Sequence, residues 1–202
     1  MSRRNVNSRG YHERKVNTRE IRQRYLIVCE GEKTEPNYFR SFRVPKKVAE
    51  IHVQGRGENP SKLVESAKEL KKQDDYDQVW CVFDRDSWTV EDFKNAINNA
   101  EVQGFKVAYS NEAFELWYVL HFEFLHTGIP RNDYKKKLTS LLRQPYKKNS
   151  DTIYDELFEK QYIAIQNAEK LLKQYEPHNP EKDNPSTTVH LLVQELNKFI
   201  HK

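Results

Sequence analysis

Two short apolar runs in the chain each end abruptly in acidic residues. Residues 25–29 (YLIVC) lead into Glu30, and residues 79–83 (VWCVF) lead into Asp84 and Asp86. A short run that is apolar at nearly every position is typical of a parallel strand covered on both faces. Because ligands of parallel sheets bind beyond the carboxyl ends of the strands, we expect these acids at a functional edge of the sheet.

The segments around these runs alternate between strand-like and helix-like patterns. Strands are predicted at 24–29, 48–53, 78–83 and 105–110, and helices at 34–43, 60–73 and 90–101. This order predicts an α/β fold with a mostly parallel four-stranded sheet and helical crossovers. Thr34 and Asn59 stand where the N-caps of the first two helices are expected.

The second half of the chain has no evident strand. Helical patterns are predicted at 111–125, 135–142, 152–174 and 187–200. We therefore expect residues 24–202 to form one domain, in which 24–110 build the sheet and 111–202 form a mainly helical extension.

Positive charge is concentrated at the N-terminus. Residues 1–24 hold eight arginines or lysines and two glutamates, a net charge of +6; since the whole chain carries +4, the remaining 178 residues carry −2. We interpret residues 1–23 as a basic tail that is disordered on its own. Such a tail either binds nucleic-acid phosphates or only adds solubility.

The composition also indicates a compartment. No run of 18 apolar residues is present, the first residues lack the apolar core of a signal peptide, and Cys29 and Cys81 both lie in predicted strands. Buried free thiols are typical of a reducing compartment. The sequence therefore predicts a cytoplasmic protein without a membrane span.

The acids after the two apolar runs are of the kind that binds hard divalent cations. Mg²⁺ prefers carboxylate oxygens, and an Asp-x-Asp turn such as Asp84-Arg85-Asp86 directs two carboxylates into one small volume. Glu30 on a neighbouring strand would add a ligand or a general base. Asp86 alone could instead cap the next helix. Two clusters at equivalent strand ends favour a metal site suited to phosphoryl transfer.

A further acid is predicted to be buried. Glu115 lies in the almost uniformly apolar segment 111–125, and an unpaired buried carboxylate would cost several kcal/mol. It therefore needs a partner, which is either a metal ion or an arginine or lysine. His121 lies roughly 120° around the helix from Glu115 and is interpreted as structural, with a supporting role at the site as the alternative.

Several other residues are candidates for phosphate contact. Arg56 either meets a phosphate or belongs to a plain strand-to-helix turn. Ser186 either caps the last helix or offers its hydroxyl to a phosphate. The basic patch at 135–148 either follows a nucleic-acid backbone or is a solvated face. The candidates for contact with nucleic acid are Arg3, Arg4, Arg9, Lys33, Arg56, Lys147 and Lys148.

Four stretches resemble the RloB-like family of Toprim-related proteins: LIVCEGEKTEPNYF, VFDRDS, SNEAFELWYVLHF and NPSTTVHLLV, which together span residues 26–193. A strand followed by Glu-Gly, and a later strand followed by Asp-x-Asp, resembles the Toprim module of topoisomerases, primases and certain nucleases. The resemblance implies a Toprim-like, Rossmann-like sheet and binding of Mg²⁺ or Mn²⁺ by Glu30, Asp84 and Asp86.

The resemblance also implies a role in prokaryotic, anti-phage defence beside an ATPase partner encoded nearby. No tyrosine stands where a topoisomerase nucleophile would. We therefore expect a metal-dependent nuclease that hydrolyses DNA or RNA, with Glu30, Asp84, Asp86 and Glu115 as catalytic residues. Glu35 is a possible supporting residue. Whether Glu30, Glu32 or Glu35 is the general base stays open.

Other classes fit less well. A haloacid-dehalogenase-type phosphatase carries its Asp-x-Asp after the first strand, whereas VFDRDS follows at least two strands. A P-loop needs Gly-x4-Gly-Lys-Ser/Thr, and EGEKT lacks that spacing. The remaining alternative is a non-catalytic nucleic-acid-binding or regulatory subunit of an ATPase-containing complex, in which the acids hold a structural ion.

Overall fold

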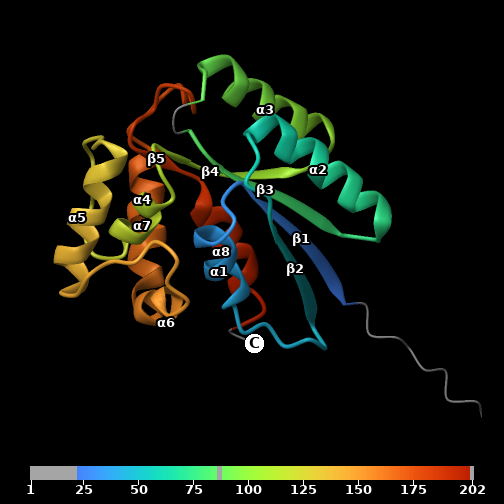
Figure 1. Ribbon diagram of the computed structural model, residues 1–202, viewed down its shortest axis with the longest axis horizontal. Coiled ribbons are helices and arrows are strands. Elements are labelled where there is room, and N and C mark those ends of the chain that lie inside the picture. The colour runs from blue at the N-terminus through green and yellow to red at the C-terminus, as the bar shows by residue number, and fades with distance from the viewer. Residues whose placement is uncertain (1–21, 86–87, 201–202) are drawn as a thin grey trace, which may run out of the picture.

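The computed structural model describes residues 22–85 and 88–200 (Figure 1). The predictions for Arg3, Arg4, Arg9 and Asp86 lie outside these residues. The first half contains β1 (Gln23–Cys29), α1 (Thr34–Arg40), β2 (Ala49–Gly55), α2 (Pro60–Gln73), β3 (Gln78–Asp84), α3 (Val90–Val102) and β4 (Lys106–Asn111). The second half contains α4 (Glu115–Leu120), α5 (Arg131–Leu142), α6 (Ile153–Leu157), the 3₁₀ turn η1 (Phe158–Lys160), α7 (Gln161–Leu172), β5 (Ser186–Thr187) and α8 (Val189–Asn197).

The sheet confirms the predicted α/β class but not the predicted number of strands. Within the described residues it has five strands in the order β2-β1-β3-β4-β5, and the first four run parallel. The fifth, β5, pairs antiparallel with Ser110 and Asn111 of β4. The prediction of four strands was wrong because a two-residue strand carries no periodicity and is defined only by its tertiary pairing.

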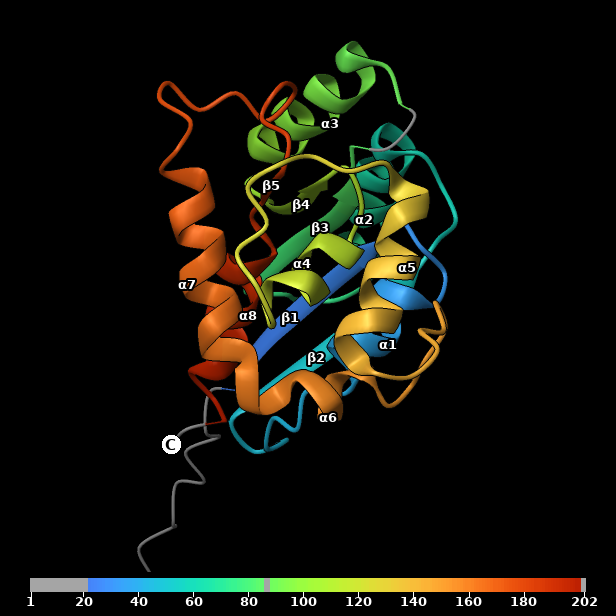
Figure 2. The ribbon, with the colours of Figure 1, turned by 90° about the vertical axis from the view of Figure 1, so that its left-hand side faces the viewer.

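Helices cover both faces of the sheet. Alternate residues of β1 point into two separate cores: Leu26 and Val28 pack with α2 and α3, whereas Tyr25, Ile27 and Cys29 pack with the helices of the other face. Figures 1 and 2 show α2 and α3 on one side of the sheet and α1, α4, α7 and α8 on the other. Two-sided burial explains why these strands lack polar alternation.

Several helix boundaries differ from the predicted ones. The helix expected at 111–125 is only the short α4, and the one expected at 152–174 divides into α6, η1 and α7. Asn59 caps α2 as predicted, through a bond from the N–H of Lys62. Thr34 is the first residue of α1 and Lys33 its N-cap, while Thr188 rather than Ser186 precedes α8. Neither Lys33 nor Thr188 makes a side-chain capping hydrogen bond, so these two helix starts lack the feature that a sequence can indicate.

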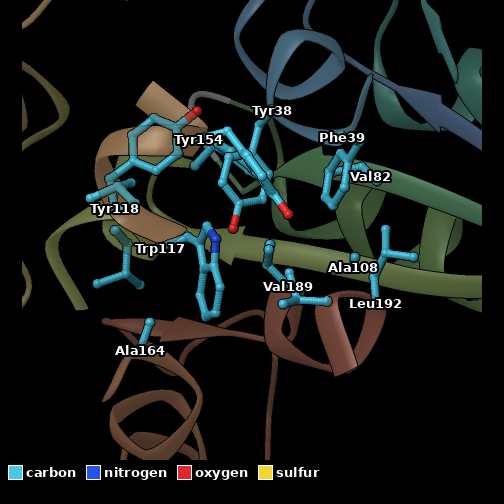
Figure 3. Packing of buried hydrophobic residues seen from close by; sticks show 14 of the residues in the cluster. Tyr38, Phe39, Val82, Ala108, Trp117, Tyr118, Tyr154, Ala164, Val189 and Leu192 are labelled. Carbon is cyan, nitrogen blue, oxygen red and sulfur yellow. The ribbon is translucent and has the colours of Figure 1, made fainter. Parts of the chain in front are cut away.

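Tyr38 of α1 is the centre of an aromatic cluster that joins the sheet to the helical extension (Figure 3). Its ring lies 5.4–5.8 Å from five other rings, those of Phe39, Phe42, Phe114, Tyr118 and Tyr154. The side chain is completely buried, and its hydroxyl accepts a hydrogen bond from Gln161. The cluster holds α1 and α4 in fixed positions, and both helices carry residues of the candidate site.

Both cysteines, Cys29 and Cys81, are buried and free, as predicted. Among the helices that the structure describes, none combines the length and the apolar composition that a membrane span requires.

Candidate metal and phosphate site

A cavity of about 490 Å³ lies beyond the carboxyl ends of β1 and β3. Its walls come from the β1–α1 loop and the start of α1, the β2–α2 loop, the end of β3 with Trp88 beyond it, the start of α5 and the α5–α6 loop. The lining residues are Glu30, Gly31, Glu32, Lys33, Thr34, Glu35, Gly57, Glu58, Asn59, Asp84, Trp88, Arg131, Lys148 and Asn149. The acids of the two predicted clusters thus share one cavity, as far as the described residues show.

Glu30 is fixed between the ends of β1 and β3. Its N–H donates to the carbonyl of Val82, which continues the parallel pairing of the strands by one residue. One carboxylate oxygen accepts from the main-chain N–H of Asp84 at 3.0 Å, and the other accepts from the indole N–H of Trp88 at 2.8 Å. The predicted approach of Glu30 to Asp84 is therefore present in the fold.

Glu35 lies in the first turn of α1 with its carboxyl group folded back over Gly31. The side chain is buried, and its Oε2 has no hydrogen-bond partner among the described residues. Burial, together with the nearby charges of Glu115 and Glu30, raises the pKa of Glu35 to about 7, although its own backbone N–H acts in the opposite direction. Glu35 therefore belongs to the acidic cluster itself.

Gly31 leaves the space that the Glu35 carboxyl fills. A Cβ added at Gly31 would lie 2.8 Å from Cδ of Glu35 and closer still to its Oε2. We expect Gly31→Ala to displace this carboxyl and to weaken Mn²⁺ binding, measured by isothermal titration calorimetry, by about tenfold. In a Glu35→Ala background the same change should have no further effect, because the obstructing group is gone. Equal losses in both backgrounds would contradict this explanation.

Asp84 is the most deeply placed acid of the cavity. Only 4% of its surface is exposed. Burial and the neighbouring charges of Glu35, Glu115 and Glu30 raise the pKa of Asp84 well above its usual value, and the opposing effect of Arg131 is smaller. The Arg131 guanidinium lies 3.7 Å from its carboxylate. Such mutual repulsion among carboxylates is relieved by bound protons or by a cation.

Glu115 begins α4 and is buried, as predicted. Its partner is the hydroxyl of Tyr146, which donates to Oε1 at 3.2 Å. Within the described residues no arginine or lysine lies within ion-pair distance of Glu115, so of the two expected partners the arginine or lysine is not found. Glu115 is not among the lining residues of the cavity, and it acts on Glu35 and Asp84 through its charge.

The raised pKa of Glu35 predicts a pH-dependent stability. Between about pH 4.5 and about 7 the folded protein holds a proton on Glu35 that the unfolded chain has lost. The free energy of unfolding therefore falls as the pH rises through this range, by at most about 1.4 kcal/mol for each pH unit. Urea unfolding in EDTA should show this decline in the wild type and a smaller one in Glu35→Gln.

The exposed Glu159 provides the matched control, since Glu159→Gln makes the same chemical change away from the cluster. We expect Glu159→Gln to keep the wild-type pH profile. If Glu35→Gln and wild type gave the same profile, Glu35 would not be the titrating group.

Three cationic side chains of the described residues line the cavity beside the acids. Lys33 lies beside the first cluster, Arg131 begins α5, and Lys148 lies in the α5–α6 loop. The carbonyl of Lys148 accepts from the hydroxyl of Thr34 at 2.9 Å, which ties this loop to the start of α1 across 114 positions of sequence. The cavity therefore combines carboxylates at its base with one cation from the β1–α1 loop and two from the helical extension, an arrangement able to hold a cation and a phosphate side by side.

The donor chemistry fits a hard divalent cation. Glu30, Glu35 and Asp84 offer carboxylate oxygens, the ligands that Mg²⁺ and Mn²⁺ prefer, and Oε2 of Glu35 is buried without a hydrogen-bond partner in the described part of the chain. Across 22–85 and 88–200 no three acidic, histidine or cysteine side chains are already arranged as a metal-binding group. Asp86, the third predicted ligand, lies outside these residues.

Other candidate residues lie away from the cavity. Arg56 is half-buried, and its N–H bonds to the carbonyl of Cys29. Lys147 is exposed in the same loop as Lys148 but does not line the cavity. His121 is buried against Trp117, with Nδ1 2.8 Å from that residue's carbonyl, and burial lowers its pKa to about 3. Ser186 lies in β5 and donates to the carbonyl of Asp183.

The sequence-based candidates did not include Arg131 and Trp88, which both contact acids of the cavity. Arg131 reaches Asp84 from a distant helix, and nothing in the local sequence around it indicates this. Trp88 follows Asp86 by two positions, and an aromatic residue with a polar N–H next to a predicted ligand was a signal that could have been used.

A known family matches most of the chain. The model of the family described as RloB-like protein matches residues 25–196, most of the chain. The comparisons with curated proteins and with solved structures found no match.

Proposed function

Since the chain belongs to the RloB-like protein family, we propose that it is a Toprim-like, metal-dependent nuclease that hydrolyses phosphodiester bonds of nucleic acid. The observation that carries the proposal is the cavity itself. Glu30 and Asp84 from neighbouring parallel strands meet at its base, and Lys33, Arg131 and Lys148 stand around them. Carboxylates that bind a cation beside cations that bind a phosphate are the parts that phosphoryl transfer requires.

Each residue has a role in this proposal. Glu30 and Asp84, with Asp86 as the resemblance implies, would hold Mg²⁺ or Mn²⁺. The bound ion would withdraw charge from the scissile phosphate and acidify an attacking water. Arg131 and Lys148 would orient the phosphate. Glu35, whose Oε2 has no partner among the described residues, would accept the proton of that water.

Glu115, which does not line the cavity, would act on the site through its charge, and Tyr146 would hold Glu115 in place. The hydroxyl of Tyr146 holds the Glu115 carboxylate, whose charge raises the proton affinity of Glu35 and Asp84. The backbone of nucleic acid would then run over Lys148 and the exposed lysines of α5, with the basic residues 1–23 adding sequence-independent contacts. A role in anti-phage defence with an ATPase partner follows from the family resemblance and is part of the proposal.

The test is cleavage of labelled single-stranded DNA, duplex DNA and tRNA in Mg²⁺, Mn²⁺ or EDTA, by wild type and by Asp84→Asn, with and without a co-expressed neighbouring ATPase. Cleavage that requires the metal and Asp84 would support the proposal and identify the substrate. Binding without cleavage in every condition would instead favour a non-catalytic nucleic-acid-binding or regulatory subunit.

A further inference from the structure

Trp88 lies in the wall of the cavity with its indole N–H directed at Glu30. Nε1 is 2.8 Å from Oε1 of that carboxylate, while Oε2 accepts from the N–H of Asp84 at 3.0 Å. Both donors belong to the segment that ends β3 and leads to α3. Because each carboxylate oxygen has two lone pairs, an oxygen that accepts one N–H can still bind a cation. The two bonds thus fix the plane of the Glu30 carboxylate.

The main chain of Trp88 is anchored through Arg85. The guanidinium of Arg85 donates to the carbonyl of Trp88, and the N–H of Arg85 donates to the carbonyl of Ser110 in β4 at 2.8 Å. The same guanidinium lies over the ring of Phe93, a fully buried residue of α3, at 5.8 Å from the ring centre. The carbonyl of Trp88 is therefore linked through Arg85 to β4 and α3, and the hydrogen bond to Glu30 orients the indole itself.

We propose that Trp88 is a positioning residue that orients the Glu30 carboxylate for a divalent cation and thereby sets the affinity of the site for that cation. The inference rests on the proposed function, because it concerns the same cavity. Residues that hold a ligand by a hydrogen bond typically change metal affinity by about 10- to 100-fold when they are replaced. Trp88 acts through Glu30 and is not itself a catalytic residue.

The chain contains a matched control for this inference. Trp80 of β3 also donates its indole N–H to a side chain, the Oε1 of Gln78 at 3.0 Å, but near the amino end of the strand and away from the acids. Trp88→Phe and Trp80→Phe therefore make the same chemical change, the loss of one indole hydrogen bond with an aromatic ring retained. Only the first change removes a partner of Glu30.

The experiment measures Mn²⁺ binding to the metal-free full-length protein by isothermal titration calorimetry. Trp88→Phe should raise the dissociation constant at least about tenfold, and Trp80→Phe should leave it within about twofold of wild type. In the cleavage assay, Trp88→Phe should need correspondingly more Mg²⁺ for half-maximal rate while its rate at saturating Mg²⁺ stays close to wild type. A general loss of protein stability would lower the rate at saturating Mg²⁺ as well, so it would not change the Mg²⁺ requirement alone.

A second measurement uses only the wild-type protein, so it does not depend on whether a variant folds. The indole ¹H–¹⁵N resonance of Trp88 in the wild-type protein should shift when Mg²⁺ is added, whereas that of Trp80 should not. Two results would overturn the inference but leave the proposed metal site in place. Wild type could bind Mn²⁺ while the Trp88 indole resonance does not shift with Mg²⁺, or Trp88→Phe and Trp80→Phe could bind Mn²⁺ with equal affinity. No binding of either cation by wild type would overturn the proposed metal site as well.

Discussion

Asp84→Asn is expected to abolish metal-dependent cleavage and at the same time to stabilise the metal-free protein. The side chain is almost fully buried, and burial together with three other carboxylates raises its pKa well above the usual value. Asparagine has nearly the same shape but carries no charge, so it removes both the proposed metal ligand and the repulsion. We expect the cleavage rate to fall by at least about 100-fold, as for the loss of a central electrostatic group.

The gain in stability should be about 1 kcal/mol or more above neutral pH, where the acids of the cluster are most ionised, and should shrink as the pH falls. Urea unfolding in EDTA at two pH values measures it. Asp155→Asn is the control, because Asp155 is exposed and pairs with the exposed Arg43. If Asp84→Asn lost stability as well as activity, Asp84 would be a structural residue of the β3 end.

Tyr38→Ala is expected to cause the largest loss of stability of any change considered for this chain. The side chain is fully buried and contacts five aromatic rings from the segments around α1, α4 and α6. Removing a buried aromatic ring leaves a cavity and typically costs about 3–5 kcal/mol. Guanidinium unfolding followed by circular dichroism would show a large fall in the midpoint.

Two further variants separate the contributions of Tyr38. Tyr38→Phe keeps the ring and loses the hydroxyl that accepts from Gln161, so it should cost only about 1 kcal/mol. Tyr162→Ala truncates an exposed tyrosine and should change stability by no more than about 0.5 kcal/mol. A similar effect of Tyr38→Ala and Tyr162→Ala would show that the aromatic cluster does not hold the two halves of the domain together.

Local signals predicted the base of the candidate site. Continuous apolar runs located β1 and β3, and the parallel order implied by the alternation of helices and strands placed Glu30 and Asp84 at the same sheet edge. The cap at Asn59 was also predicted, because its side chain bonds to the N–H of Lys62 only three positions on. These features depend on periodicity and chain order, which a sequence displays directly.

The remainder of the site depends on contacts between distant segments. The pairing of β5 with β4, the approach of Arg131 to Asp84 and the bond from Tyr146 to Glu115 each join residues far apart in the chain. No local pattern encodes such contacts. The position of Glu35 against Gly31 was also missed, because the sequence does not show which acid of a crowded loop turns inward.

The hydrogen bond between Thr34 and the carbonyl of Lys148 has a consequence for biosynthesis. A ribosome releases the two acid-bearing strands long before it releases the α5–α6 loop, so a nascent chain has the acids without the wall that carries Lys148. The wall of the cavity that carries Lys148 forms only when the second half of the chain has emerged and packed against α1. An incomplete polypeptide would thus lack the part of the cavity that carries Lys148, and the proposed activity would be confined to finished chains.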